Sequence, residues 1–332
     1  MITRTLGADG PQVSALGIGA MSFSNFYGPT DEAASHAILH RAIELGITHI
    51  DTANVYGMGA SENAIGSFLK ANPLAKDHFT IATKGSITRG PDGGNIFDNS
   101  FDHLSKSLEE SLTRLGVEAV DLYYVHRRDP DVPIEEVTGT LARLVEAGKI
   151  KSIGFSEIAP TSLRKAVAEH PVAAVQSEYS LQTRSPEMGL LQTCAQVGTA
   201  MVAFSPVGRG LLTERPHSRA AAATMPFLKD NPRFLEPNLS ANIEATAPAR
   251  ALAADHGTSL AALAIGWVLA QGNHIHAIPG TRSVLHLDEL FDGLAMSQNG
   301  ALMAEIELLL PIGWCHGERY STAQWVGPEK YC

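Results

Sequence analysis

Short apolar runs alternate with longer amphipathic segments along most of the chain. Runs rich in Val, Ile, Ala and aromatic residues predict β-strands at residues 15–19, 48–51, 80–83, 122–125, 150–155, 173–176, 200–204 and 275–278. Apolar residues at helical spacing predict helices at residues 32–45, 61–70, 101–115, 134–147, 161–168, 243–256 and 259–271. This alternation is typical of repeated βα units, and there are enough strands to close a barrel. We therefore predict an α/β fold, a (β/α)8 TIM barrel.

Turn residues support these boundaries. Residues 8–10, Ala-Asp-Gly, predict a tight turn and so an N-terminal hairpin before the first barrel strand. Gly46, Gly116 and Gly148 follow three of the predicted helices, where a left-handed C-terminal cap favours glycine. The local turn chemistry and the hydrophobic period therefore indicate the same elements.

Two long segments interrupt the alternation of predicted strands and helices. Between Val207 and about Ser240 the pattern predicts neither a strand nor a helix, and four prolines are scattered through it. A second irregular segment begins at Pro311 and contains aromatic residues. Long loops in a compact fold are usually functional. Since no linker, low-complexity tract or repeat separates the parts, we expect residues 1–332 to form a single barrel domain with long loops on the side of its site.

Composition and charge exclude several classes. The formal net charge of -10 argues against a nucleic-acid-binding protein, which needs clustered basic residues. The longest apolar stretch without charge, residues 259–270, is too short to cross a bilayer, so we expect no membrane association. The first residues lack the apolar run of a secretory signal, and Cys194, Cys315 and Cys332 form neither a CxxC pair nor an even set. A cytoplasmic location is expected.

Four polar residues follow predicted strands at the positions where a barrel carries its chemistry. Asp51 ends one strand and Tyr56 lies in the loop after it, while Lys84 and His126 end two others. In parallel α/β barrels the active site lies at the C-terminal ends of the strands. Singly, these residues could be a helix cap, a surface aromatic, a solvated charge and a core histidine. Their joint placement favours a site.

The chemistry of these four side chains suggests proton donation. A tyrosine with a pKa near 10 is a poor acid unless its phenolate is stabilised. We expect Lys84 to lower the pKa of Tyr56 by about two to three units. Asp51 would keep Lys84 charged and oriented, and His126 would hydrogen-bond a substrate carbonyl. This arrangement requires Lys84 Nζ to lie within hydrogen-bond reach of both Asp51 and the Tyr56 hydroxyl.

Two other motifs carry less weight. His274 and His276 are two apart on a predicted strand, but no third ligand at suitable spacing accompanies them, so we predict no metal site. The sequences Gly-Met-Gly at residues 57–59 and Gly-Arg-Gly at residues 208–210 do not complete a GxGxxG fingerprint between a strand and a helix. A Rossmann domain is disfavoured.

Several segments resemble the aldo-keto reductases. The resemblance rests on ITHIDTANVYG at residues 47–57, on Ser-Glu at 61–62, on Ala-Thr-Lys at 82–84 and on DLYYVH at 121–126. It extends essentially from Leu6 to Leu290. Further segments, including VQSEYSL at 175–181 and FSPVGRG at 204–210, are most similar to the branch of YakC-type and auxin-induced-type reductases.

The resemblance implies a barrel that binds NADPH across its top and reduces an aldehyde or ketone. Asp51, Tyr56, Lys84 and His126 would be catalytic. The residues implied in binding the nicotinamide and pyrophosphate are Ser156, Gln176, Phe204, Ser205, Pro206, Val207, Gly208, Arg209, Gly210 and Leu211. Ser156 and Gln176 would hold the nicotinamide carboxamide, Phe204 would stack on the nicotinamide ring, and Arg209 would offer charge to the pyrophosphate. Glu157 stands where many members have Asn.

The adenosine end is implied by the segment that follows the last strand. The residues concerned are Gly280, Thr281, Arg282, His286 and Glu289. Arg282 is the candidate clamp for the 2′-phosphate, since a guanidinium matches a phosphate dianion. NADPH is therefore expected over NADH.

The substrate pocket can be predicted only as a set of alternatives. Met21, Phe23 and Tyr27, with Phe26 between them, either form its wall or pack under the loop. Arg127 either reaches the pocket or forms a surface ion pair. The aromatic residues of the tail, Trp314 and Trp325, either close over the substrate or anchor the tail.

The function expected is NADPH-dependent reduction of a small carbonyl compound to the alcohol. A cofactor-sensing regulatory subunit with vestigial turnover is the alternative from another class, although no added interaction segment is visible. A third possibility is oxidation of an alcohol by NADP⁺. The sequence leaves open the substrate, the physiological direction, the strictness for NADPH and the oligomeric state.

Overall fold

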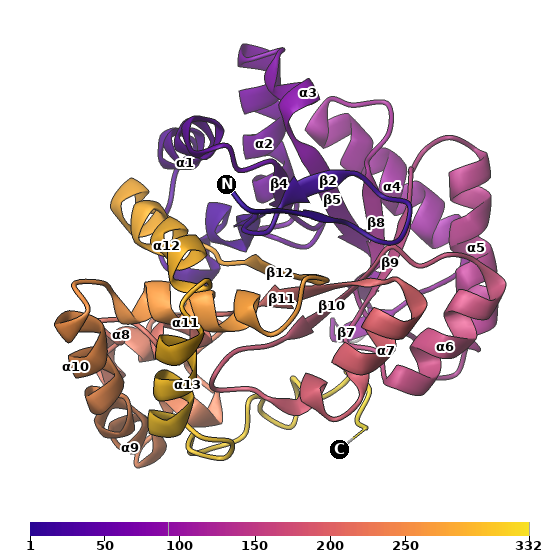
Figure 1. Cartoon of the computed structure of the whole chain (residues 1–332). Coiled ribbons are helices and arrows are strands. Elements are labelled where there is room, and N and C mark those ends of the chain that lie inside the picture. Colours follow the sequence, from indigo (N-terminus) through magenta and orange to yellow (C-terminus); the bar gives the residue numbers. More distant parts are fainter. Residues whose placement is uncertain (92, 332) are drawn as a thin grey trace.

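The computed structural model describes residues 1–91 and 93–331 and contains a barrel of parallel strands surrounded by helices (Figure 1). The strands are β1 Thr3–Thr5, β2 Gln12–Ser14, β3 Ile18–Gly19, β4 His49–Asp51, β5 Thr80–Gly85, β6 Ile87–Arg89, β7 Asn95–Phe97, β8 Leu122–Val125, β9 Ile153–Ser156, β10 Ala174–Glu178, β11 Ala200–Phe204 and β12 Ile275–Ile278. The α-helices are α1 Glu32–Leu45, α2 Ala60–Ala71, α3 Ala75–His78, α4 Phe101–Leu115, α5 Ile134–Glu146, α6 Pro160–Glu169, α7 Leu190–Val197, α8 Arg219–Ala223, α9 Asn238–Ala245, α10 Ala247–Asp255, α11 Leu260–Ala270, α12 Val284–Met296 and α13 Gly300–Leu309. Short 3₁₀ helices are η1 Ala20–Phe23, η2 Asn25–Tyr27, η3 Ser185–Glu187, η4 Gly208–Gly210 and η5 Pro232–Phe234.

Eight strands pair in the order β12-β11-β10-β9-β8-β5-β4-β3, and each neighbouring pair is parallel. A parallel bridge between Leu16 and Ala277 joins the chain beside β3 to β12. The amide of Gly17 donates to the Ala277 carbonyl at 2.8 Å, and the amide of Ala277 donates to the Ala15 carbonyl at 2.9 Å. These bonds close the sheet, so the predicted barrel is confirmed.

Side chains alternate between the inside and the outside of the barrel. On β5, Ala82 belongs to a small apolar cluster with residues of the other strands, while Ile81 packs against the helices. On β8, Leu122 and Tyr124 belong to the inner cluster, and Tyr123 and Val125 to the outer core. Because the period is two, the next inward positions at the strand ends are occupied by Lys84 and His126. The strand period itself therefore directs these polar groups to one end of the barrel.

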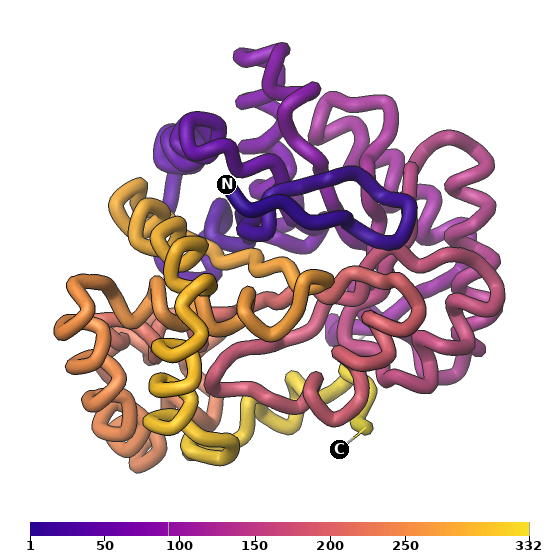
Figure 2. Tube along the Cα trace, in the orientation of Figure 1, coloured from indigo at the N-terminus to yellow at the C-terminus, as the bar shows by residue number. Residues whose placement is uncertain are grey.

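Opposite ends of the barrel are covered by different segments (Figure 2). The hairpin β1–β2 lies at the end where the strands begin, and Arg4 fixes it there by donating to the carbonyls of Gly272 at 2.8 Å and Leu269 at 2.7 Å. The chain after α13, in yellow, crosses the other end, where residue Glu329 accepts from the amide of Ala159 at 2.7 Å. The N-terminal hairpin predicted from the sequence is confirmed.

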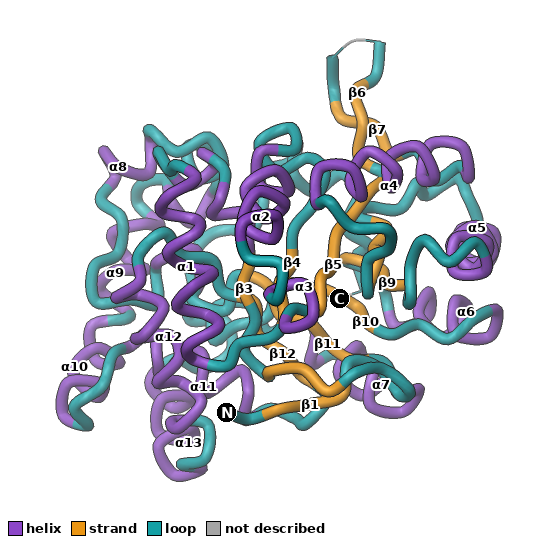
Figure 3. The backbone as a smooth tube through the Cα atoms, turned by 90° about the horizontal axis from the view of Figure 1, so that it is seen from above, coloured by secondary structure: helices purple, strands orange, loops and turns teal. Residues whose placement is uncertain are grey.

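The structure differs from the sequence prediction in several helices. Residues 243–256 do not form one helix, because Pro248, in the first turn of α10, has no amide hydrogen to continue α9. The pattern did not single out α7, α12 or α13. It also missed the hairpin β6–β7, which projects beyond the ring of helices in Figure 3. The irregular segment from Val207 contains the short helix α8 and the 3₁₀ helices η4 and η5 before α9 begins.

Candidate active site

The four predicted catalytic residues meet at the C-terminal ends of β4, β5 and β8. Lys84 is fully buried, and its Nζ donates to a carboxylate oxygen of Asp51, to the Thr52 carbonyl at 2.8 Å and to the Tyr56 hydroxyl at 3.3 Å. The expected reach of Lys84 to both Asp51 and Tyr56 is therefore confirmed. Burial alone would lower the pKa of Lys84, but the neighbouring Asp51 and Tyr56 raise it. Lys84 thus carries its charge directly beside the phenol.

The Tyr56 hydroxyl is more weakly acidic than we expected. Loss of solvation raises the pKa of Tyr56 above its ordinary value of 10.0, and Lys84 opposes this shift only in part. The predicted lowering by two to three units is wrong for this structure, because desolvation of the phenolate outweighs the attraction of one ammonium already paired with Asp51. At neutral pH Tyr56 is protonated and able to donate.

His126 stands beside the phenol as a neutral imidazole. Its ring lies edge-on to that of Tyr56, with 5.7 Å between centroids. Burial, together with the nearby charges of Arg127 and Lys84, holds the pKa of His126 well below its usual 6.5. Its Nδ1 is buried and has no hydrogen-bond partner among the described residues. A neutral ring has one N–H, which is the group needed to hydrogen-bond a carbonyl oxygen.

The two residues predicted to hold a carboxamide lie on neighbouring strands: Ser156 ends β9, and Gln176 is the middle residue of β10. Gln176 Nε2 donates to Asp51 Oδ2 at 2.7 Å. The Ser156 hydroxyl accepts from Arg127 Nη1 at 2.9 Å. Both side chains are buried, and Phe204 ends the next strand as a half-buried ring. The barrel thus brings these three predicted residues to the same end as Lys84.

The loop after β11 packs closely against Gln182 at Gly208. Gly208 has a φ of 60°, and a Cβ there would lie 2.2 Å from Gln182 Oε1. Both polar atoms of the Gln182 side-chain amide are buried without a hydrogen-bond partner among the described residues. Backbone and unpaired amide therefore form a polar cradle beside Ser205, Pro206 and Val207.

Arg209, which was predicted to offer charge to a pyrophosphate, is already paired within the protein. Its guanidinium is buried and pairs with Glu178, and it also donates to the Arg319 carbonyl at 3.1 Å. Because Glu178 already neutralises it, Arg209 does not offer free charge to a pyrophosphate in this structure. Gly210 follows with a φ of 95°, and Leu211 is buried in a separate apolar cluster under the long loop.

The segment predicted for the adenosine end lies between β12 and α12. A Cβ at Gly280 would lie 2.9 Å from the Gly19 carbonyl, so only glycine fits there. Arg282 is exposed, and its Nη1 donates to the Pro29 carbonyl at 2.8 Å. His286 and Glu289 lie exposed on α12, and Thr281 Oγ1 accepts from the Ser283 amide at 3.1 Å. The Arg282 guanidinium therefore lies against the loop that follows β3.

The residues predicted to form the pocket wall do not lie together: some pack in the hydrophobic core and others lie nearer the surface. Phe23 is only 4% exposed and belongs to the main core, so the packing alternative describes it. Met21 is half-buried. The Tyr27 ring contacts Phe227 edge-on at 6.0 Å, and Phe26 contacts Tyr56 at 6.5 Å. Phe26 is therefore the loop aromatic that reaches the predicted proton donor.

Sequence reasoning missed a buried ionic cluster that joins the tail to the barrel. We define this cluster as Glu157, Glu178, Arg209, Arg233 and Arg319. Glu157 has a φ of 58° and pairs with Arg319, whose Nη1 donates to Glu157 Oε1 at 3.0 Å. The departure at Glu157 is thus explained by a partner on the tail. The signal was present in the sequence, since two glutamates at barrel strand ends require cationic partners.

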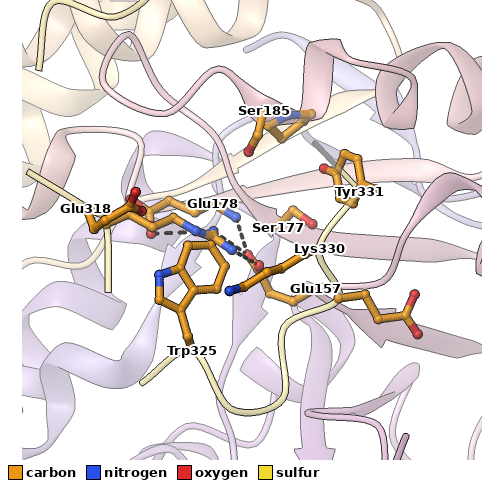
Figure 4. Close-up of a pocket in the computed structure, with 11 residues that line it drawn as sticks. Glu157, Ser177, Glu178, Ser185, Glu318, Trp325, Lys330 and Tyr331 are labelled. Atoms are coloured by element: carbon orange, nitrogen blue, oxygen red, sulfur yellow. Dashed lines mark hydrogen bonds and ion pairs between the residues drawn. The ribbon is translucent and has the colours of Figure 1, made fainter. Parts of the chain in front are cut away.

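A cavity of about 380 Å³ lies beside this cluster (Figure 4). The figure shows Trp325 and Lys330 of the tail facing Glu157 and Glu178. Trp325 packs on Tyr320 and on the Arg319 guanidinium, at 5.6 Å and 4.8 Å between centres. Trp314 donates from Nε1 to the Leu181 carbonyl at 2.8 Å, which is an anchoring contact.

Other features of the described residues bear on the remaining expectations. No group of three or more His, Cys, Asp or Glu side chains suited to a metal ion occurs in the part of the chain that the structure describes. Within those residues no single helix could span a membrane by length and composition; only a pair bent by 93°, residues 238–255 with 260–270, reaches the criteria together. Cys194 and Cys315 are free thiols, whereas Cys332 lies outside the described residues.

Comparison with known proteins identifies the class. Residues 15–307 match the aldo/keto reductase family. The chain belongs to this family and is an oxidoreductase.

Particular relatives support this assignment along nearly the whole chain. It is 37% identical to the aldo-keto reductase yakc [NADP(+)] of Schizosaccharomyces pombe over 96% of this chain and 94% of that protein. It is 40% identical to the probable aldo-keto reductase 1 of Glycine max over 95% and 90%. Among solved structures, a glycerol dehydrogenase from Gluconobacter oxydans matches with a TM-score of 0.78 and 25% identity, covering 93% of this chain and 96% of that one. A thermostable aldo-keto reductase in complex with epalrestat matches with a TM-score of 0.71 and 28% identity, covering 93% and 100%.

Proposed function

We propose that this protein uses NADPH to reduce an aldehyde or ketone to the alcohol, with Tyr56 as the general acid. The observation that carries the proposal is the contact of one buried ammonium, Lys84 Nζ, with both Asp51 and the Tyr56 hydroxyl. An acid next to a fixed positive charge loses its proton with less cost as the charge develops. Membership of the aldo/keto reductase family supports carbonyl reduction in general.

The chain's residues fit the cofactor. The cradle beside Gly208 offers backbone and the unpaired Gln182 amide, while Ser156 ends β9 and Gln176 lies on β10 in contact with Asp51. NADP(H) is also supported by the name of the Schizosaccharomyces pombe relative, which includes NADP(+). In this proposal Ser156 and Gln176 hold the carboxamide, Phe204 stacks on the ring, and Arg282 binds the 2′-phosphate.

Each side chain then has one task. Bound NADPH supplies the hydride that adds to the carbonyl carbon. Tyr56 donates its hydroxyl proton to the carbonyl oxygen, and Lys84 stabilises the phenolate left behind. Neutral His126 donates its N–H to the same oxygen and so orients the carbonyl before the transfer. Asp51 keeps Lys84 charged and directed at the phenol.

Replacement of Tyr56 by Phe tests the proposal, because it removes one hydroxyl and leaves the ring contacts with Phe26 and His126. NADPH oxidation is followed in the presence of a panel of aldehydes and ketones. The expected loss in kcat is about 10²- to 10⁴-fold, as for removal of a general acid. NADPH affinity, measured by fluorescence titration, should change little. NADPH binding without turnover in the unaltered protein would contradict the proposal and favour a cofactor sensor.

A further inference from the structure

Arg127 lies directly after His126 and points part of its guanidinium at the catalytic group. Its Nη1 donates to the His126 carbonyl at 2.7 Å and to the Ser156 hydroxyl at 2.9 Å. These two bonds use both hydrogens of Nη1. Nε and Nη2 donate to no acceptor among the described residues, and neither is a buried unpaired atom. One side of the guanidinium is therefore open.

Arg127 also lacks a carboxylate partner, unlike the cations around it. Arg128, the next residue, pairs with Glu329 of the tail, Lys84 pairs with Asp51, and Arg319 pairs with Glu157. No ion pair of Arg127 occurs among the residues that the structure describes. The surface ion pair that the sequence left as an alternative is thus wrong. Arg127 acts on the Glu157 carboxylate only at longer range, and Glu157 is already paired with Arg319. A half-buried cation without an ion pair of its own, in a chain of net charge -10, is a local attraction for an anion.

The stem of Arg127 lies against the tail. A Cβ at Gly327 of the tail would lie 3.0 Å from Arg127 Cδ and 2.8 Å from the Phe97 ring of the hairpin β6–β7. The stem of Arg127 therefore packs against Gly327, which also lies beside the hairpin. Its charge also acts on the predicted catalytic residues, since it helps to lower the pKa of His126. The guanidinium therefore lies close to His126, beside which a carbonyl substrate would react in the proposed function.

We propose that Arg127 is a substrate-binding residue that selects aldehydes or ketones carrying a carboxylate. The inference rests on the proposed function of the site and names its substrate class. The Nε–H and Nη2–H groups of an arginine form a planar fork that matches the two oxygens of a carboxylate. Arg127 keeps this fork unpaired while Nη1 fixes the guanidinium to His126 and Ser156.

Matched aldehydes test the selection. 4-Formylbenzoate and 4-methylbenzaldehyde are similar in shape but differ in charge. We expect kcat/KM to be about 10- to 100-fold higher for 4-formylbenzoate, as a charge-assisted bidentate pair predicts. In Arg127→Met this preference should be lost: the ratio of kcat/KM for 4-formylbenzoate to that for 4-methylbenzaldehyde should fall to about 1, whatever the change in overall rate. Arg164→Met on α6, outside the barrel, is the control that removes a cation without touching the site.

Benzoate provides a readout that does not depend on turnover. It should inhibit reduction of 4-methylbenzaldehyde competitively in the unaltered protein and in Arg164→Met, but not in Arg127→Met. Equal loss with both aldehydes in Arg127→Met would overturn the inference and indicate that Arg127 only positions His126. Equal efficiency with both aldehydes in the unaltered protein, without inhibition by benzoate, would overturn it while leaving the proposed function intact. Failure to reduce either aldehyde, or any of the panel, would instead contradict the proposed function.

Discussion

Desolvation and Lys84 act on the Tyr56 hydroxyl in opposite directions, and their balance predicts the pH profile. Because desolvation is the larger effect, the pKa of Tyr56 lies above its ordinary value of 10.0. A general acid works only while it is protonated. Carbonyl reduction should therefore remain on a plateau up to about pH 10 and decline only beyond it.

Replacement of Lys84 by Met provides the matching test. It removes the ammonium that opposes desolvation, so the alkaline decline should move to still higher pH while the plateau rate falls. The measurement is kcat at saturating NADPH between pH 6 and 11, with circular dichroism to confirm folding at each pH. A decline centred near pH 8 in the unaltered protein would show that Tyr56 is more acidic than the structure implies.

Arg282 is expected to make the protein bind NADPH more tightly than NADH. Its guanidinium is exposed and makes one hydrogen bond, to the Pro29 carbonyl, so most of its donors remain available. Arg282→Ala should weaken NADPH binding about 10- to 100-fold and leave NADH binding nearly unchanged, since only NADPH has the 2′-phosphate. Fluorescence titration of both cofactors measures this, with Arg89→Ala on the hairpin β6–β7 as control. Equal weakening of both would remove the assigned role.

Individual site residues were predictable where a polar side chain stands at the end of an apolar strand. Asp51, Lys84 and His126 are polar residues at the ends of apolar runs, and this placement alone indicates a site. The partners of Glu157 and Glu178 were not predictable. Arg319 and Arg233 come from irregular segments more than fifty residues away along the chain, and no period relates them to the strands. The sequence analysis also missed the direction in which the pKa of Tyr56 shifts. The desolvation of its hydroxyl depends on loops whose conformation a sequence pattern does not give.

At the scale of elements, the hydrophobic period worked best where one face is clearly apolar. The bounds of α1, α4, β8, β11 and β12 agree with the prediction to the residue. The helices that the pattern did not single out, α12 and α13, pack against α11, which is buried on all sides. Their apolar positions therefore follow the surface of another helix rather than the barrel, which weakens the expected pattern.

The tail is the element whose attachment can be tested most directly. Arg319 and Glu157 are 8% and 4% exposed, so removal of the cation leaves a buried carboxylate without its main partner. We expect Arg319→Met to lower the free energy of unfolding by about 3 to 5 kcal/mol. Amide hydrogen exchange in residues 318–331 should increase at the same time, because Arg319 and Glu329 hold this segment to the barrel.

Lys330→Met is the matched control within the same tail. Lys330 is exposed and lies 4.9 Å above the Trp325 ring, a contact worth about 0.5 to 1 kcal/mol. Urea unfolding and exchange should therefore change little. Equal effects of the two variants would show that the tail is held by packing rather than by the buried ion pair.

For the molecule as a whole, two histidines inside the barrel set its resistance to acid. His49 and His276 are fully buried, and neither nitrogen of His49 has a hydrogen-bond partner among the described residues. Burial, aided by Lys84, lowers the pKa of His49 to about 4; burial, aided by His49, lowers that of His276 to about 3. Both rings are therefore neutral in the folded barrel, and the attraction of the Asp121 carboxylate offsets only part of the lowering of the His49 pKa.

The sign of the pH dependence follows from these shifts. The unfolded chain binds protons at its histidines near pH 6.5, whereas the folded barrel does not until about pH 4 for His49 and about pH 3 for His276. The contribution of each ring is thus fully present above pH 6.5 and is lost as the pH falls toward the folded value. Shifts of this size correspond to about 3 to 5 kcal/mol each.

The free energy of unfolding, measured by urea at intervals from pH 7 to 4, should fall steeply over this range. In His49→Gln the slope should be shallower by close to one proton, whereas His256→Gln, which alters an exposed ring, should retain the slope of the unaltered protein. An unchanged slope in His49→Gln would mean that water or a shift of the barrel lets His49 take up its proton without unfolding.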